Sequence, residues 1–339
     1  MRRPLQRVVL LAAGIGLFAV LCRRLGLGEL GQALARAEPR RLVAFLALSV
    51  AVFLVYAKRW SIVLVAIADG QPPPALHTLL GFRAAEHAVS TLLPSAHLSG
   101  EPMRAFLVRR RGRGWVQAIA SVTVDRMLDA TASSVLGPIY VVVFFLANDA
   151  SAWAAPWVLG GMIAGVAALA GFYLHSLRGN TLISVLARRG FFPSARGSLE
   201  SIDKRLAEFL RTRSFLLALA LSFLAEGVII AELWTLASAF ALPISLPTLV
   251  GVMVGMGIAQ LIPIPASIGS LEATEVGVLT LAGGSAPLGL AVGLVVRLRE
   301  TLWTLVGLAV LYAEGLSWHS VADAAAPTSG NTAAIGPKE

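Results

Sequence analysis

Residues 79–113 read LLGFRAAEHAVSTLLPSAHLSGEPMRAFLVRRRGR, and this stretch decides how the rest of the chain is interpreted. Two apolar runs flank a break at 94–102 that contains two prolines and a glycine. The stretch is too polar for a continuous membrane span, because it holds Arg83, Glu86, His87, Glu101 and Arg104. Irregular backbone at membrane depth is tolerated only where protein or a wet cavity surrounds it. We therefore predict a pair of half-helices over 79–108 that enters the membrane, turns back and forms one wall of a buried polar site.

The composition is typical of a multi-pass membrane protein. The chain has 339 residues, is 57% hydrophobic and only 14% charged, and has a mean hydropathy of +0.77. Soluble domains carry about 25% charged residues. The net charge of +9 comes from arginines that cluster between apolar runs, as the positive-inside rule expects, and does not indicate nucleic-acid binding. The single cysteine, Cys22, excludes an intrachain disulfide and a cysteine-based metal site.

Further apolar runs predict an all-α protein with about six full membrane spans. We expect these spans at about 8–22, 42–68, 115–147, 157–174, 215–242 and 287–311. The first has the outline of a signal peptide but lacks a small-x-small cleavage site, so it is expected to remain as a span. Residues 178–213 place apolar side chains at helical spacing among arginines and lysines, which predicts a basic amphipathic helix at the cytoplasmic interface. The tail at 316–339 is expected to be disordered.

A second broken stretch, 248–282, repeats the plan of the first. It has two short apolar runs, 248–262 and 271–282, on either side of a proline-containing turn. In both stretches a proline leads to a glycine and then to an acid at a helix start; the residues are Pro94, Gly100 and Glu101 in the first, and Pro265, Gly269 and Glu272 in the second. Paired Pro/Gly-broken segments in two halves of a chain indicate a midplane substrate site.

This correspondence predicts an inverted repeat. Both termini, the arginine loop at 109–113 and the basic segment 178–213 are placed in the cytoplasm. The broken stretches then dip into the membrane from opposite faces, the first within a repeat at 1–177 and the second within a repeat at 214–315. Half-helix N-termini turned towards the midplane favour an anionic group such as a lipid phosphate, and the neighbouring acids could exchange protons.

The pattern R-x₂-E-x₇-P-x₅-G-E-x₂-R at 83–104 is similar to the first-half signature of the lysylphosphatidylglycerol synthase transmembrane family. The second-half signature of that family, Pro-Gly-Gly-x-Gly-x-x-Glu, corresponds to 265–272, where two of its glycines are replaced by Ala266 and Ser267. The resemblance covers about residues 5–315. The start of the third span, Asp125-Arg126, most resembles a stand-alone, hopanoid-associated subgroup, and the synthase domain of the lipid-lysinylating branch is not expected. The resemblance implies a flippase-like protein of the bacterial inner membrane that moves lipid between leaflets.

Charged groups at membrane depth cost about 2.5–3.5 kcal/mol on insertion scales, so central ones are candidates for function. The candidate substrate site comprises Arg83, Glu86, Ser90, Pro94, Gly100, Glu101, Arg104, Asp125, Arg126, Asp129, Pro265, Gly269, Glu272, Arg297 and Glu300. Structural alternatives stay open for several of them: an ion pair within one helix for Arg83 and Glu86, a network at the interface for 125–129, and a helix cap for Glu272. Arg299 is expected to face away from this site, and roles for Glu226 and Glu232 are left open.

Three functions remain open. The first is transport of an anionic or hopanoid-type lipid; the second is a lipid-modifying transferase or hydrolase with Glu101 or Asp125 as general base; the third is a scaffold for lipid-synthesis enzymes docked through 178–213. No nucleotide-binding loop is present, and the spacing of the histidines matches no metal motif, so no cofactor or metal is expected. Membrane lipids are the expected partners, with lipid-biosynthesis enzymes and a second copy of the chain left open.

Overall fold

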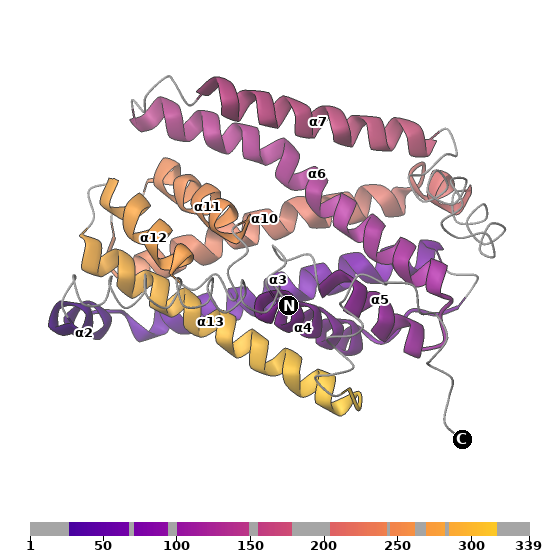
Figure 1. Ribbon diagram of the computed structural model, residues 1–339, viewed down its shortest axis with the longest axis horizontal. Helices are drawn as coiled ribbons and strands as arrows, with labels where there is room; N and C mark the ends of the chain where they lie inside the picture. Colours follow the sequence, from indigo (N-terminus) through magenta and orange to yellow (C-terminus); the bar gives the residue numbers. More distant parts are fainter. Residues whose placement is uncertain are drawn as a thin grey trace, which may run out of the picture.

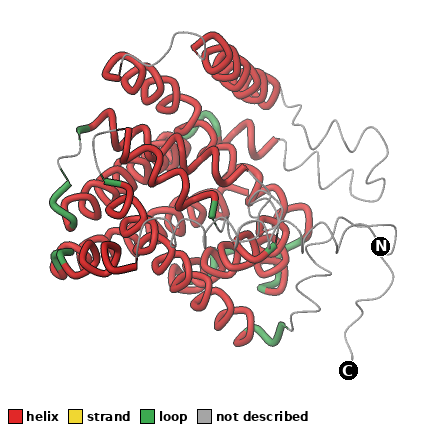
Figure 2. The backbone as a smooth tube through the Cα atoms, turned by 60° about the vertical axis from the view of Figure 1, so that its left-hand side comes forward, coloured by secondary structure: helices red, strands yellow, loops and turns green. Residues whose placement is uncertain are grey.

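The computed structural model describes residues 27–67, 71–93, 100–148, 155–177, 204–242, 245–261, 269–281 and 285–316. Within these ranges the chain is helical and has no strand, as Figure 2 shows, so the predicted all-α class is confirmed. Several predicted features lie outside the described residues: the span at 8–22, most of the basic segment 178–213, nearly all of the tail 316–339, and the turns that hold Pro94 and Pro265.

The helices lie within three residues of the predicted apolar runs. In chain order they are α2 (Leu27–Ala35), α3 (Pro39–Ile67), α4 (Leu76–Leu92), α5 (Gly100–Arg110), α6 (Trp115–Asn148), α7 (Ala155–Leu177), α10 (Arg213–Ala239), α11 (Leu246–Leu261), α12 (Ser270–Leu281) and α13 (Ala286–Ala313). Helix α2 lies between the first two predicted spans. The sequence breaks at 94–102 and 263–269 separate α4 from α5 and α11 from α12.

Helices α3 and α10 form the central antiparallel pair (Figure 1). Near one end of the pair, Arg59 Nη1 donates to Ser222 Oγ at 3.1 Å. At the other end, the backbone N–H of Glu38 donates to the carbonyl of Ala239 at 2.8 Å. Among the described residues, these are the two helices that are long and apolar enough to cross a membrane, judged by length and composition.

The four helices next to the sequence breaks are short. Helix α5 has 11 residues and α12 has 12, so at about 1.5 Å per residue each reaches about 16–18 Å, little more than half of a hydrocarbon core of about 30 Å. Figure 1 shows α4 and α5 towards one end of the molecule, and α11 and α12 towards the other. Two buried apolar cores accompany this division. One is centred on α4, α5 and the start of α6, and the other on α11, α12 and α13.

Helix α13 links the two ends, because it packs against α12 and then runs antiparallel along α4. Gly307 allows this approach, since a Cβ atom there would overlap the backbone oxygen of Ala84 and lie 2.7 Å from the Cβ of Ala88. Such contacts place His87 on α4 beside Glu300 on α13, with His87 Nε2 and Glu300 Oε2 at 3.0 Å. The packing of α13 therefore positions groups of the site described below.

We expect Gly307→Ala to lower the thermal unfolding midpoint in detergent, because overpacking a close contact costs about 1–3 kcal/mol. The matched control is Gly227→Ala on α10, where nothing lies within 4 Å of the added Cβ. There the better helix propensity of alanine should leave the midpoint unchanged or raise it. Equal midpoints for the two variants would show that α4 and α13 do not meet as closely as described.

Candidate functional site

A first charge cluster joins four arginines and four carboxylates from α3, α4, α5 and α6. Its members are Arg59, Arg83, Arg104 and Arg126, with Glu86, Glu101, Asp125 and Asp129. Asp125 is its centre. One of its carboxylate oxygens accepts from Arg59 Nε at 2.8 Å, and the other accepts from Arg104 Nη1 at 2.7 Å and faces Arg83 Nη1 at 3.4 Å. The side chains of Asp125, Arg59 and Arg104 are wholly buried.

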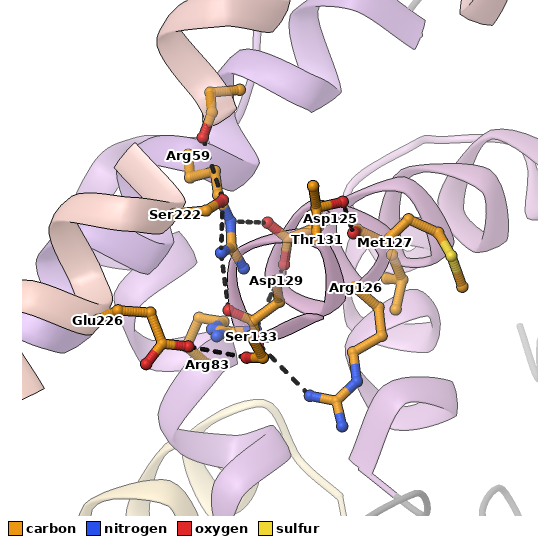
Figure 3. A network of polar contacts seen from close by, with 12 residues as sticks. Arg59, Arg83, Asp125, Arg126, Met127, Asp129, Thr131, Ser133, Ser222 and Glu226 are labelled. Atoms are coloured by element: carbon orange, nitrogen blue, oxygen red, sulfur yellow. Dashed lines mark hydrogen bonds and ion pairs between the residues drawn. The ribbon is translucent and has the colours of Figure 1, made fainter. Parts of the chain in front are cut away.

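Arg59 ties three helices together (Figure 3). From α3 its Nη1 donates to Asp129 Oδ1 on α6 at 2.9 Å and to Ser222 Oγ on α10 at 3.1 Å. Arg59 was not among the predicted site residues. The available signal was its place inside an otherwise apolar span, where an arginine is functional or paired by default.

Glu86 and Arg83 pair within α4, which is the structural alternative that their spacing left open, with Arg83 Nη1 and Glu86 Oε2 at 3.0 Å. The pair is not isolated, because Arg104 Nη1 from α5 lies 3.4 Å from the same oxygen. Aromatic rings support the guanidinium groups. The Tyr56 ring lies 4.5 Å from Arg83 Cζ, and the Trp60 ring lies 4.6 Å from Arg104 Cζ, both within the range of cation–π attraction.

Glu101 and Arg126 form the more accessible edge of this cluster. Arg126 Nε lies 3.1 Å from Glu101 Oε1, and Arg126 Nη1 lies 3.5 Å from Asp129 Oδ2. The Arg126 side chain is 49% exposed, in contrast to the buried arginines around Asp125. Gly100 lets the start of α5 pack closely against α4, because a Cβ at this position would overlap Ser90 Oγ and the carbonyl oxygen of Glu86.

A second charge cluster involves α12 and α13 with one residue each from α4 and α10. Its members are Glu272, Glu275, Arg297, Arg299, Glu300, His87 and Glu232. Glu272 makes the helix-cap contact that the sequence left open as its structural alternative, and it also forms an ion pair. One oxygen pairs with Arg297 Nε at 2.9 Å, and the other accepts from the backbone N–H of Gly269 at 2.8 Å, as in a helix cap. Gly269 has a φ of 81°, which favours glycine.

The structure corrects the expectation for Arg299. Its side chain faces α10, away from Glu272, which is the partner of Arg297. It is nevertheless part of the second charge cluster. Its Nη1 lies 2.8 Å from Glu232 Oε1, and its Nη2 contacts Glu300. Because Glu300 also meets His87 of α4, two adjacent residues of α4 serve different clusters: Glu86 the first and His87 the second.

Two further acids, Glu226 and Glu275, are buried but belong to none of the ion pairs described above. Glu226, whose role the sequence left open, is buried on α10 and accepts from Ser133 Oγ at 2.8 Å. Glu275 is wholly buried on α12, and among the described residues neither of its carboxylate oxygens has a hydrogen-bond partner. Glu275 was not among the predicted site residues, although it lies one turn after Glu272 in the same half-helix. Among the residues described by the structure, no group of three or more His, Cys, Asp or Glu is placed to hold a metal ion.

Two comparisons place the chain among known proteins. Residues 7–308 match the family described as "Lysylphosphatidylglycerol synthase TM region". A protein named "UPF0104 membrane protein" from Methanothermobacter thermautotrophicus is 25% identical over 312 residues, which cover 86% of this chain and 90% of that protein. Because the family match extends over nearly the whole chain, the protein belongs to the membrane-protein family of the lysylphosphatidylglycerol synthase transmembrane region.

Proposed function

We propose that the protein moves a lipid with an anionic headgroup between membrane leaflets, and that α4–α5 and α11–α12 are re-entrant pairs, each of which contributes to one of the two charge clusters along the path of the lipid. The observation that carries this proposal is the gathering of buried ion pairs between two helices too short to cross a bilayer, α5 and α12, and the long helices α6 and α13 that follow them. Charges in a hydrocarbon core are rare, pair with one another and mark substrate pathways. Discontinuous helices that point their N-termini at a midplane substrate are a recurring device of secondary transporters.

The two halves support an inverted repeat because they align in sequence without a gap. When Glu101 is aligned with Glu272, Arg126 falls on Arg297, and in each half the acid pairs with that arginine. The same alignment brings the starts of α4, α5 and α6 onto those of α11, α12 and α13, to within a single position. The packing also crosses between the halves: α4 lies against α13, and α11 lies against α6.

Arg126 and Arg297 are the residues that we assign to the lipid headgroup. They are equivalent in the alignment of the two halves, and their side chains are 49% and 20% exposed, whereas Arg59 and Arg104 are wholly buried around Asp125. Each is held by an acid at the start of a half-helix. An anionic headgroup could therefore displace Glu101 or Glu272 and gain an arginine, which binds phosphate and carboxylate in the same forked geometry.

The proposed orientation follows the arginines that end the first pair. Arg109, Arg110 and Arg111 are exposed at the end of α5, and Arg111 pairs with Glu314 beyond the end of α13. By the positive-inside rule, we infer that this end of α5 faces the cytoplasm. The cytoplasmic location of both termini stays a prediction from the sequence. A bacterial inner-membrane location and a hopanoid-type or modified phospholipid as cargo rest on the family resemblance.

The test is leaflet exchange of a fluorescent phosphatidylglycerol in liposomes that contain the purified protein. We expect Arg126→Gln and Arg297→Gln each to slow exchange about tenfold, which corresponds to about 1.4 kcal/mol of lost stabilisation of the crossing lipid. Glu101→Gln and Arg83→Ala should also slow it. The control is Arg36→Gln, which removes an exposed charge outside both clusters.

Unchanged exchange in all four site variants would remove the site assignment. Mass spectrometry of the recovered lipid distinguishes the enzymatic alternative, since a transferase or hydrolase would change the mass of the probe. If the wild-type protein leaves the lipid unmodified and exchange is no faster than in protein-free liposomes, the scaffold alternative would be favoured over transport.

A further inference from the structure

Glu275 is a buried acid without a partner. It lies in the second turn of α12 with 0% exposure, and in the part of the chain that the structure describes neither carboxylate oxygen receives a hydrogen bond. The packing around it is close. Gly293 of α13 faces the carboxylate, and a Cβ atom at that position would lie 2.8 Å from Glu275 Oε2.

The charged groups around Glu275 are already paired. On α12, Glu272 pairs with Arg297; on α13, Arg299 meets Glu232 of α10 as well as Glu300. Helix α11, which packs against α12, has no ionisable residue. The second charge cluster therefore has four glutamates for two arginines and one histidine. An ionised carboxylate that is buried without a partner is strongly unfavourable, and such a group takes up a proton instead.

The alignment of the two halves shows which residue of the first half is equivalent to Glu275. In the alignment that matches Glu101 with Glu272, the equivalent of Glu275 is Arg104, and the equivalent of Val296 is Asp125. Arg104 and Asp125 form a wholly buried ion pair in the first half. The second half lacks this pair, because an acid stands at the position of the arginine and a valine at the position of the aspartate. A buried ion pair in one half thus corresponds to a single buried acid in the other.

We propose that Glu275 is a proton-binding site, occupied in the conformation described here, and that release of its proton accompanies the movement of lipid. The coupling, though not the proton site itself, rests on the proposed transport function. The O–H bond of the carboxylic acid breaks when water reaches the site, the proton passes to that water, and a carboxylate remains. Rebinding of a proton from the other side of the membrane restores the acid.

Infrared difference spectroscopy tests the proton site without any transport assay. In detergent that lacks carbonyl groups, the wild-type protein at neutral pH should show the carbonyl stretching band of a protonated carboxylic acid. Glu275→Gln should lose this band, and Glu272→Gln, which removes an arginine-paired acid, should retain it. Glu275→Leu serves as a second variant that also lacks the carboxyl group. Thermal unfolding of each variant establishes that it is folded.

The second arm measures exchange of fluorescent phosphatidylglycerol with and without a pH gradient across the liposome membrane. We expect the gradient to change the wild-type rate and to have no effect on Glu275→Gln. A wild-type spectrum without the glutamic-acid band overturns the proton site whatever the transport result. A band together with an unchanged gradient response in Glu275→Gln overturns the coupling. A band without lipid exchange in any variant supports the proton site and contradicts the proposed transport function.

Discussion

Replacing Asp125 by alanine is expected to destabilise the folded protein more than any other single truncation in the first charge cluster. The carboxylate receives Arg59 and Arg104 in a wholly buried environment and also faces Arg83. Removing one partner of a buried ion pair costs about 3–5 kcal/mol, because the opposite charge stays buried without compensation. The measurement is the thermal unfolding midpoint in detergent, followed by tryptophan fluorescence.

A surface acid provides the control for this prediction. Glu38 pairs with Arg41 at 2.6 Å, but both side chains are 48% exposed, so Glu38→Ala should cost no more than about 1 kcal/mol. Combining Asp125→Leu with Arg104→Met removes a whole pair and should be less destabilising than Asp125→Ala. If Asp125→Ala unfolds at the same temperature as Glu38→Ala, the buried cluster does not exist as described.

Reversing the charge of Arg297 is the second large expected effect. Arg297→Glu places two carboxylates where Arg297 Nε now meets Glu272 Oε1 at 2.9 Å, in a site where Glu272 is nearly inaccessible. Like charges brought together in a buried site cost several kcal/mol, so both the thermal stability and the rate of lipid exchange should fall. Arg297→Gln, which removes the charge without reversing it, should be folded more stably than Arg297→Glu.

A double variant in which Glu272 and Arg297 exchange their charges distinguishes the contribution of the pair to stability from its contribution to lipid exchange. Glu272→Arg with Arg297→Glu restores opposite charges, and we expect its unfolding midpoint to recover most of the loss. Lipid exchange should remain slow, because the arginine has moved from α13 to the capping position on α12, where the backbone N–H of Gly269 now needs an acceptor. Wild-type exchange by this double variant would mean that the pair has a purely structural role.

The sequence was most informative where local chemistry decides the structure. The breaks around Pro94 and Pro265 predicted where helices stop, since proline and glycine disfavour a continuous helix, and the neighbouring helices lie within three residues of the predicted runs. The acids at the starts of α5 and α12, Glu101 and Glu272, were proposed from the same pattern. Their arginine partners on α6 and α13 were also proposed, but the pairing itself was not.

What the sequence did not show is set by packing between distant segments. Arg59 belongs to the site because α3 contacts both α6 and α10, and no local pattern places those three helices together. Arg299 was expected to face away from the site, because it lies two positions after Arg297 and therefore on another face of the helix. On that face, Glu232 of α10 is its partner. The isolation of Glu275 could be recognised only when every neighbouring charge had been assigned to a partner.

In the proposed topology, two broken pairs of helices enter the membrane from opposite faces and end inside it. Single cysteines in a Cys22→Ser background, labelled with a membrane-impermeant thiol reagent in right-side-out and inside-out vesicles, test this topology. The ends of the first pair are represented by His77 and Arg111, those of the second by Ser245 and Ser285, and the inner end of α4 by Leu93; the first four are exposed. Together these five positions report both the face from which each pair enters and the depth that α4 reaches.

We predict that cysteines at 77 and 111 react only from the cytoplasmic face and those at 245 and 285 only from the outer face, while a cysteine at 93 does not react from the outer face. Labelling of all four pair ends from one face, or of position 93 from the outer face, would contradict the account.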